Sequence, residues 1–230
     1  MLLCHGFTGC PQSLRPWGEY LAAQGFTVRC PRLPGHGSCW QDRNKTRWPD
    51  WYAAVETELL ALLARGRPVF VCGLSMGGTL ALRLAEQHSD IAGLVLVNPS
   101  LLTERLDAHA LPLLSRLVPT LAGVAGDIAK PGAHEVGYDR LPLKAAASLQ
   151  QLWKVTRTDL ATVRVPVLLY RSATDHVVEP ASALLLHSRI GSADLTEVVL
   201  QRSYHVATLD YDAPTIFEGT TNFIERVSAP

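Results

Sequence analysis

The sequence has no excess of charge of either sign. Its 21 basic and 21 acidic side chains cancel over 230 residues, so the formal net charge at pH 7 is zero. A neutral chain has no net positive charge to attract nucleic acid or an anionic membrane surface. Charged residues are scarce, at 18%, while apolar residues make up 47% of the chain. This balance excludes a disordered protein and predicts a single domain with a substantial core.

Paired cysteines and long apolar runs are also missing. The five cysteines form no C-x-x-C pair, and a chain of this size does not need disulfides, so we expect reduced thiols buried as small hydrophobes. Arg, Pro or Gly interrupts every leucine-rich stretch well before the roughly 18 residues of a membrane span. The start lacks the basic region of a signal peptide. We therefore expect a cytoplasmic protein, and, because Cys and His show no ligand spacing, neither a metal nor a cofactor.

Short β-branched runs alternate with segments of helical spacing, which predicts an α/β protein with a parallel sheet covered by helices. The runs are apolar at nearly every position, as strands buried on both faces should be. The predicted strands are Met1–His5, Phe26–Cys30, Pro68–Cys72, Ile91–Asn98, Val165–Tyr170 and Leu195–Leu200. Apolar residues at helical spacing predict helices over Ser13–Gln24, Trp51–Leu63 and Met76–His88.

This alternation stops between Asn98 and Val165. The intervening stretch contains no convincing strand and is rich in Leu, Ala, Pro and Gly. It is too long for a plain connection inside a compact domain. We expect residues 99–164 to form a small helical cap, inserted into an α/β core made of residues 1–98 and 165–230.

The segment VFVCGLSMGGTLALRLA carries the strongest chemical signal. A predicted buried strand, Val69–Cys72, runs through Gly73 to Ser75 and then directly into a helix. A nucleophile at the tip of a sharp strand-to-helix turn crowds the residues two positions before and after it, and small residues such as Gly73 and Gly77 relieve that crowding. Ser75 is therefore the predicted nucleophile, at the positive N-terminus of the following helix.

A serine nucleophile needs a base, and the base needs an orienting acid. Of the eight histidines, His205 follows the last predicted strand, in a loop at the carboxyl edge of the sheet. Asp175 follows another buried strand, and the order Ser75, Asp175, His205 is the one expected in an α/β-hydrolase. Asp194 and Asp210 remain alternative acids, although each can be explained as a cap at the start of an element.

Negative charge that develops on the attacked carbonyl oxygen needs two backbone N–H donors. Met76, the residue after the predicted nucleophile, should supply one. The loop HGFTG, which follows the first predicted strand, should supply the other through Phe7. These two donors together predict an oxyanion hole.

The chain resembles the α/β-hydrolases of the bacterial monoacylglycerol lipase and carboxylesterase group, and its bacillus-type lipases in particular. The matching segments span nearly the whole chain and are LLCHGFTGCPQSLRPWGEYLAAQGFTVRCPRLPGHG, VCGLSMGGTLALRLAEQHSDIAGLVLVN, ATDHVVEP and SYHVATLDYD. The resemblance implies the same triad and oxyanion donors, and a cap that admits one acyl chain. It also implies that Glu135, in HEVGYDRLP, contacts a glycerol head group; an unbonded surface glutamate is the competing interpretation.

The start of the chain departs from this group. Its members usually begin with an edge strand or an extended arm, whereas this chain starts inside the first predicted strand, at Met1. We expect either a truncated start or a sheet with an exposed strand edge.

These observations predict a serine hydrolase that cleaves carboxylic esters through an acyl-enzyme. A leucine-rich cap over a neutral site favours a small uncharged lipid ester, and monoacylglycerol is the expected substrate. The alternatives are a carboxylesterase for short- to medium-chain esters and, from another class, a ligand-binding protein that retains the fold without catalysis. Without a basic amphipathic helix, membrane association through the cap should be weak. The sequence does not determine the oligomeric state.

Overall fold

A computed structural model describes residues 1–105, 108, 110–123 and 126–229 of the chain. Its centre is a five-stranded sheet in the order β1-β2-β3-β6-β7, in which every neighbouring pair is parallel. The strands are β1 (Leu2–Cys4), β2 (Val69–Leu74), β3 (Ile91–Val97), β6 (Val167–Ser172) and β7 (Leu195–Leu200). The predicted α/β architecture with a parallel sheet is thus confirmed.

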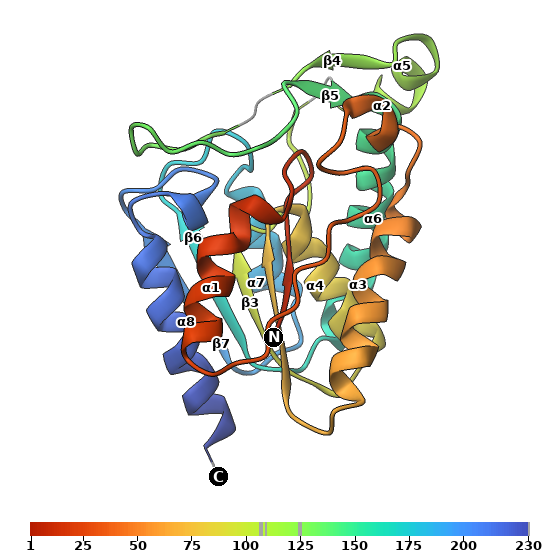
Figure 1. Cartoon of the computed structure of the whole chain (residues 1–230). Coiled ribbons are helices and arrows are strands. Elements are labelled where there is room, and N and C mark those ends of the chain that lie inside the picture. Colours follow the sequence, from red (N-terminus) through yellow and green to blue (C-terminus); the bar gives the residue numbers. More distant parts are fainter. Residues whose placement is uncertain (106–107, 109, 124–125, 230) are drawn as a thin grey trace.

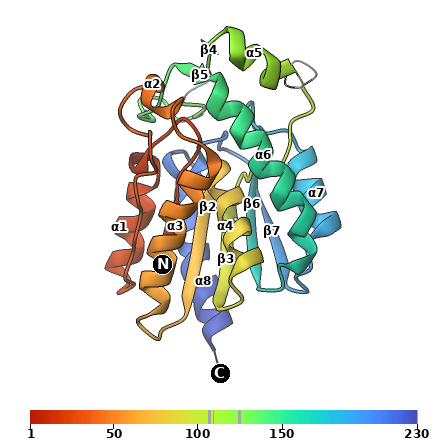
Figure 2. The same ribbon diagram turned by 90° about the vertical axis from the view of Figure 1, so that its right-hand side faces the viewer.

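Helices cover both faces of the sheet (Figure 1). One face packs against α1 (Arg15–Ala23) and α8 (Ala213–Ser228). The other face packs against α3 (Trp48–Leu63), α4 (Met76–Gln87), α6 (Leu143–Asp159) and α7 (Ala181–Arg189), and Figure 2 shows α3, α4 and α6 from their own side. The described residues also form short helical turns, namely η1 (Pro11–Leu14), α2 (Trp40–Arg43), η3 (Leu160–Thr162) and η4 (Ala207–Leu209).

The strands are apolar at consecutive positions because each face of the sheet has its own core. In β2, Val69 and Val71 belong to the cluster beneath α3 and α4, whereas Phe70 and Cys72 belong to the cluster beneath α1 and α8. Successive side chains of a strand point to opposite faces, so a run of apolar residues fills both layers. The strand was predicted from its consecutive apolar residues, and these are present because both faces of the sheet are buried.

One predicted strand is wrong. Phe26–Cys30 is extended but forms only an isolated bridge, between Arg29 and Leu2. The N–H of Leu3 donates to the Arg29 carbonyl at 2.8 Å, and the N–H of Arg29 donates to the Met1 carbonyl at 2.9 Å. The segment touches the short edge strand β1 at one residue and then leaves it, so no ladder forms. Propensity favoured a strand, but β1 offers too little edge to pair with.

The segment 99–164 contains helices, which the sequence predicted in kind. It also contains a small β-ribbon, which the sequence did not predict. Helix α5 (Leu111–Leu117) is followed by β4 (Thr120–Ala122), which pairs antiparallel with β5 (Arg140–Pro142). These elements lie above the carboxyl end of the central sheet (Figure 1). Helix α6 instead descends along the sheet and contributes Ala145, Leu149 and Leu152 to the core. The segment therefore serves both as an upper layer and as part of the packed sandwich.

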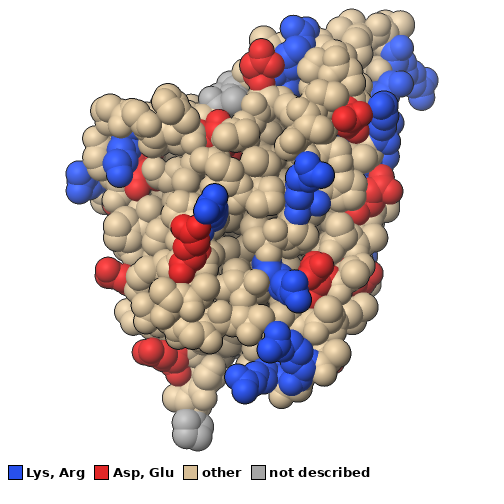
Figure 3. All heavy atoms as spheres, in the orientation of Figure 1, with Lys and Arg blue, Asp and Glu red and all other residues tan. Residues whose placement is uncertain are grey.

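The cysteines are all unpaired, as expected, but they differ in exposure. Cys4, Cys10 and Cys72 are buried, Cys30 is half-buried and Cys39 is exposed. In the described part of the chain, no helix has both the length and the apolarity that crossing a bilayer requires. On the face drawn in Figure 3, basic and acidic side chains are interspersed among large uncharged areas.

Candidate active site

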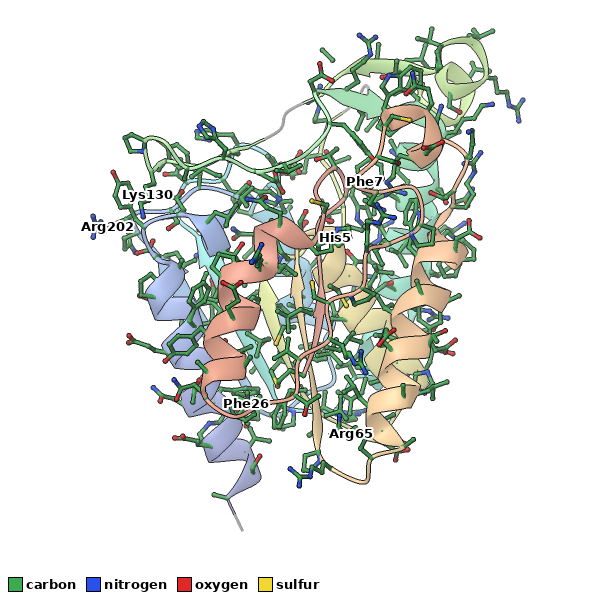
Figure 4. All side chains as sticks on the ribbon, in the orientation of Figure 1. His5, Phe7, Phe26, Arg65, Lys130 and Arg202 are labelled. Atoms are coloured by element: carbon green, nitrogen blue, oxygen red, sulfur yellow. The ribbon has the colours of Figure 1, made fainter. Side chains whose placement is uncertain are left out.

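The carboxyl ends of the parallel strands bring the predicted site residues to one edge of the sheet. Because the strands all run the same way, the loops that leave them meet there. These loops carry His5 to Phe7 after β1, Ser75 after β2, Asn98 after β3, Asp175 after β6 and His205 after β7. Figure 4 shows His5 and Phe7 at this end of β1, beneath the upper layer.

Ser75 occupies the strained turn that the sequence predicted. Its backbone has φ 55° and ψ −121°, outside the regions that a side chain normally tolerates, and it sits immediately before α4. A Cβ on Gly73 would overlap the backbone of Gly77, and a Cβ on Gly77 would overlap the carbonyl of Cys4. Both glycines are therefore required by close backbone approach. Ser75 is only 8% exposed, at the bottom of the site.

His205 and Asp175 form a buried hydrogen-bonded pair. The Nδ1 atom of His205 lies 2.8 Å from Oδ2 of Asp175, while Oδ1 of Asp175 accepts the N–H groups of Val177 and Val178, both at 2.8 Å. Burial opposes ionisation of both groups. The hydrogen bond and the opposite charge outweigh it, so the pKa of Asp175 is lowered and the pKa of His205 is raised. Since Nδ1 is occupied, Nε2 is the ring atom left for a proton from a hydroxyl.

The hydroxyl of Ser75 makes no hydrogen bond to His205 or to any other group in the described part of the chain. The two residues are linked through β3 instead. The N–H of Ser75 donates to the Val97 carbonyl at 2.9 Å, and the side chain of the next residue, Asn98, donates to the His205 carbonyl at 2.8 Å. Hydrogen bonds between a nucleophile and its base are often formed only once substrate is bound.

The two alternative acids have structural partners. Asp194 pairs with Arg226 on the surface, at 2.7 Å and 3.1 Å. Asp210 is buried and accepts four backbone N–H groups, at 2.7 to 2.9 Å. Neither carboxylate is hydrogen-bonded to the His205 ring, whereas Asp175 is.

The two predicted oxyanion donors belong to segments that adjoin Ser75, namely the first turn of α4 and the loop after β1. Met76 begins α4, so its N–H has no partner within the helix. The N–H of Phe7 also has no acceptor among the described residues. A Cβ built on Gly6 would lie 3.6 Å from Cβ of Ser75, which shows that the loop after β1 packs directly against the nucleophile turn.

A buried arginine supports this loop. The guanidinium of Arg43 lies 3.5 Å from the ring centroid of Trp51 and 4.3 Å from that of Phe7. Its Nε donates to the Phe7 carbonyl at 3.2 Å, and an Nη lies 3.6 Å from the sulfur of Met76. Arg43 is fully buried, and cation–π contacts are strongest where water is excluded. One side chain thus contacts both predicted oxyanion residues.

Two other histidines near the site are structural. The Nδ1 of His5 donates to the Gly6 carbonyl at 3.0 Å, and its Nε2 accepts the N–H of Leu33 at 3.3 Å. Burial lowers the pKa of His5 to about 4 and also lowers the pKa of His36. Both rings are therefore neutral and pack edge to face, with centroids 4.8 Å apart.

Glu135 reaches the site from the segment above the sheet. Its Oε1 lies against Gly9, where a Cβ would collide with it, and its Oε2 accepts the N–H of Gly126 at 3.3 Å. Burial raises the pKa of Glu135, and its charge in turn raises the pKa of His205. Glu135 is therefore near the base and the oxyanion loop, and it is not an unbonded surface residue.

Sequence reasoning missed the contribution of Asn98. Its side-chain oxygen accepts the N–H of Ser172 at 2.8 Å, while its amide donates to the Ser172 hydroxyl at 2.9 Å and to the His205 carbonyl at 2.8 Å. It also has a positive φ of 44°. The only available signal was a polar residue at the end of an apolar strand. Asn98 ties the ends of β3 and β6 to the histidine loop.

Comparison with known proteins places the chain in a family. Residues 1–212 match the family described as Serine aminopeptidase, S33, whose members are serine hydrolases of the α/β-hydrolase superfamily. The chain belongs to this family. It is 40% identical over 226 residues to a thermostable monoacylglycerol lipase of a Bacillus species, an alignment that covers 98% of this chain and 90% of that protein. The predicted resemblance to bacterial monoacylglycerol lipases and carboxylesterases is thereby confirmed.

Other proteins are similar to this chain in sequence, in fold or in both. A carboxylesterase of Bacillus subtilis is 25% identical over 230 residues, covering 99% of this chain and 92% of that protein. A structure described for metagenome-derived lipolytic enzymes superposes with a TM-score of 0.94 at 37% identity, covering 98% of this chain and 92% of the other. The monoacylglycerol lipase of Paleococcus ferrophilus, at 20% identity, shares the fold with a TM-score of 0.81 over 99% of this chain and 94% of its own.

Proposed function

We propose that the protein is a monoacylglycerol lipase in which Ser75, Asp175 and His205 form the catalytic triad. Ser75 Oγ attacks the ester carbonyl while His205 Nε2 takes its proton, and the N–H groups of Phe7 and Met76 stabilise the oxyanion. His205 then protonates the departing glycerol oxygen, leaving an acyl-enzyme. A water molecule, deprotonated by His205, releases the fatty acid. The observation that carries this proposal is the buried Asp175–His205 pair beside a strained Ser75 at one sheet edge.

Two observations support the proposed substrate class, namely a similar protein and the position of Glu135. The monoacylglycerol lipase that is 40% identical supports a monoglyceride, and Glu135, close to both Gly9 and His205, is the residue we propose to contact the glycerol head group. The second candidate is a carboxylesterase for short- to medium-chain esters. The likeness to a carboxylesterase over nearly the whole chain favours it.

We propose that residues 99–164 act as the cap of this enzyme. Exposed leucines on its outer surface support a weak association with lipid surfaces, since Leu113 is 65% and Leu117 78% exposed. The unpaired state of all five cysteines supports a cytoplasmic location.

The experiment is release of fatty acid from 1-monooleoylglycerol, run beside hydrolysis of p-nitrophenyl butyrate, for wild type and Ser75→Ala. We expect monoglyceride turnover that falls at least about a thousandfold in the variant, because removing the nucleophile leaves only binding and the oxyanion hole. Serine-dependent hydrolysis of the butyrate ester alone would move the substrate to small esters. Equal turnover by wild type and variant would overturn the proposed nucleophile.

A further inference from the structure

A carboxylate from the segment above the sheet reaches both triad loops. Asp127 lies between the proposed cap ribbon strands β4 and β5, and its side chain is only 10% exposed. One of its oxygens, Oδ2, accepts the backbone N–H of His176 at 3.1 Å and that of His205 at 3.2 Å. His176 immediately follows Asp175. A single oxygen atom therefore bridges the loop that carries the acid and the loop that carries the base.

The remaining contacts of Asp127 strengthen this bridge. Its other oxygen, Oδ1, lies 2.8 Å from Nδ1 of His176, and its backbone carbonyl accepts the N–H of Val206 at 3.0 Å. The His176 ring in turn packs edge to face on Tyr204, with centroids 4.7 Å apart. The Asp127 carboxylate therefore contacts the acid loop through His176 and the base loop through His205, while the Asp127 backbone adds a contact to Val206.

The segment around Asp127 has separate anchors of its own. Asp210 accepts the N–H groups of Ala129 at 2.7 Å and Lys130 at 2.9 Å, and Ile128 packs against the core beneath α8. Figure 4 shows Lys130 at the outer corner of this segment, near the loop that carries Arg202. These anchors do not involve the Asp127 carboxylate. A variant that loses only this carboxylate should therefore keep the fold of the segment.

We propose that Asp127 is a positioning residue of the reaction, which holds the Asp175 loop and the His205 loop in register and adds a negative charge near the catalytic imidazole. The inference rests on the proposed function, because it assumes that His205 is the base. Asp127 does not touch the reacting atoms. It acts through the two backbone N–H groups and through its charge.

The charges that face His205 agree with this role. Three carboxylates act on the imidazole: Asp175 is hydrogen-bonded to it, and Glu135 and Asp127 act on it through their charge. Burial opposes the charged imidazolium, but Asp175 first, and then Glu135 and Asp127, raise the pKa of His205. The imidazolium forms during acylation, so negative charge beside it stabilises the transition state as well as the resting cation. The titratable group facing Asp127 from the other side is His176.

Replacing Asp127 by Asn retains the size of the side chain but removes its charge and one acceptor. The pKa of His205 should fall, since a negative charge nearby favours the protonated imidazolium and that charge has been removed. The acidic limb of the pH profile would then move to lower pH. At the same time the plateau rate should fall about tenfold, because a neutral amide oxygen is a weaker acceptor than a carboxylate for the two bridged N–H groups, so the triad loops are less well aligned.

The test is the pH dependence of inactivation by a fluorophosphonate, which reports the reactivity of Ser75 with its base and needs no lipid substrate. Wild type, Asp127→Asn, Asp127→Ala and Ser75→Ala are compared between pH 5 and 9, with melting temperatures measured in parallel. Asp139→Asn is the matched control, because Asp139 is an exposed acid of the same segment whose side chain makes no hydrogen bond in the described part of the chain.

The inference is supported if Asp127→Asn has a lower plateau rate of inactivation and a pH midpoint below that of wild type. Asp127→Ala should lose more of the plateau rate, and Asp139→Asn should keep the wild-type rate and midpoint. A wild-type midpoint and plateau for Asp127→Asn would overturn it. So would a loss of rate that is fully accounted for by an unfolded fraction at the assay temperature. Failure of the proposed function looks different, because wild type would then react no faster than Ser75→Ala.

Discussion

At the scale of single residues, Arg43 is a buried cation that contacts aromatic rings, a carbonyl, a hydroxyl and a sulfur atom. In the described part of the chain no carboxylate pairs with it, although it is fully buried. Its contacts with Phe7 and Met76 instead fix the two proposed oxyanion donors. A buried cation without an ion-pair partner contributes little to stability relative to an apolar residue of similar size. Arg43 is therefore expected to matter for the rate more than for folding.

Replacing Arg43 by Met should lower kcat for p-nitrophenyl butyrate about tenfold and leave KM within about twofold. The reason is that oxyanion donors interact with charge that exists only in the transition state, and a tenfold loss corresponds to ~1.4 kcal/mol. The affinity for a boronic acid, which mimics the tetrahedral intermediate, should fall by a similar factor. Lys45→Met, which removes an exposed cation two residues away, is the control. A raised KM with unchanged kcat would contradict this role.

No local pattern marks Arg43, Asn98 or Asp127 in the sequence. Arg43 ends a polar tetrapeptide, WQDR, that reads as an exposed turn of helix. Asp127 lies far from Asp175 and His205 along the chain, and only folding brings its carboxylate to their loops. Ser75, in contrast, was predictable because its strained turn needs glycines at fixed neighbouring positions. Local backbone constraints leave a sequence pattern, whereas long-range hydrogen bonds do not.

At the scale of elements, the site depends on how closely α4 approaches the end of β1. Gly77, in the first turn of α4, lies so close to the carbonyl of Cys4 that a Cβ would overlap it. Both backbones are held in place, β1 by its pairing with β2 and α4 by the strained turn at Ser75. Neither can move without disturbing the nucleophile.

Gly77→Ala should therefore lower the free energy of unfolding by about 3 kcal/mol, the upper range for overpacking in a core. Urea unfolding followed by tryptophan fluorescence measures this change. Gly18→Ala is the matched control, because its Cβ would meet Leu3 and Val28 at ordinary contact distances of 3.6 Å. Within helix α1, that control should gain up to about 1 kcal/mol from helix propensity. Equal midpoints for the two variants would show that the approach of α4 to β1 is not rigid.

Most of the elements that the sequence predicted correctly are buried on both sides or strongly periodic, whereas the edge strand β7 is only partly buried. Strands β2, β3, β6 and β7 were predicted to within a few residues, as were helices α3 and α4. Phe26–Cys30 was wrongly predicted as a strand, and the β4–β5 ribbon was not predicted at all. In both cases, whether the segment becomes a strand depends on a neighbouring strand with a free edge to pair with. The residues of the segment itself do not determine this.

At the scale of the whole molecule, apolar side chains gather on the outer surface of the proposed cap. Leu113 and Leu117 of α5 are 65% and 78% exposed, and Leu121 of β4 is 42% exposed. They lie above the end of the sheet where the site is (Figure 1). Elsewhere the visible surface is an interspersed mixture of charges and uncharged groups (Figure 3). The cap surface is thus the part of the described chain best suited to touch a lipid aggregate.

The double variant Leu113→Ser with Leu117→Ser should bind zwitterionic phosphatidylcholine vesicles at least about tenfold more weakly than wild type. Each leucine loses roughly 1.5 kcal/mol or more of apolar transfer free energy if it inserts into the interface. Co-sedimentation with the vesicles measures binding, and hydrolysis of soluble p-nitrophenyl butyrate should stay unchanged. Leu60→Ser, at a 50% exposed position of α3, should leave binding unaltered. If the control and the double variant bind alike, the cap leucines do not contact the lipid.

By itself the sequence determined the parallel α/β architecture, the strained turn at Ser75 and the membership of a serine hydrolase family. The architecture follows from strands that are apolar on successive residues, and the turn follows from the close approach of Gly73 to Gly77, four residues away. The family follows from motifs spread along the chain. Only the tertiary structure decided which acid meets His205, which side chains brace the oxyanion loop, and that Asp127 bridges two distant loops. Such contacts join segments more than 25 residues apart, so their geometry exists only once the strands have brought their carboxyl ends together.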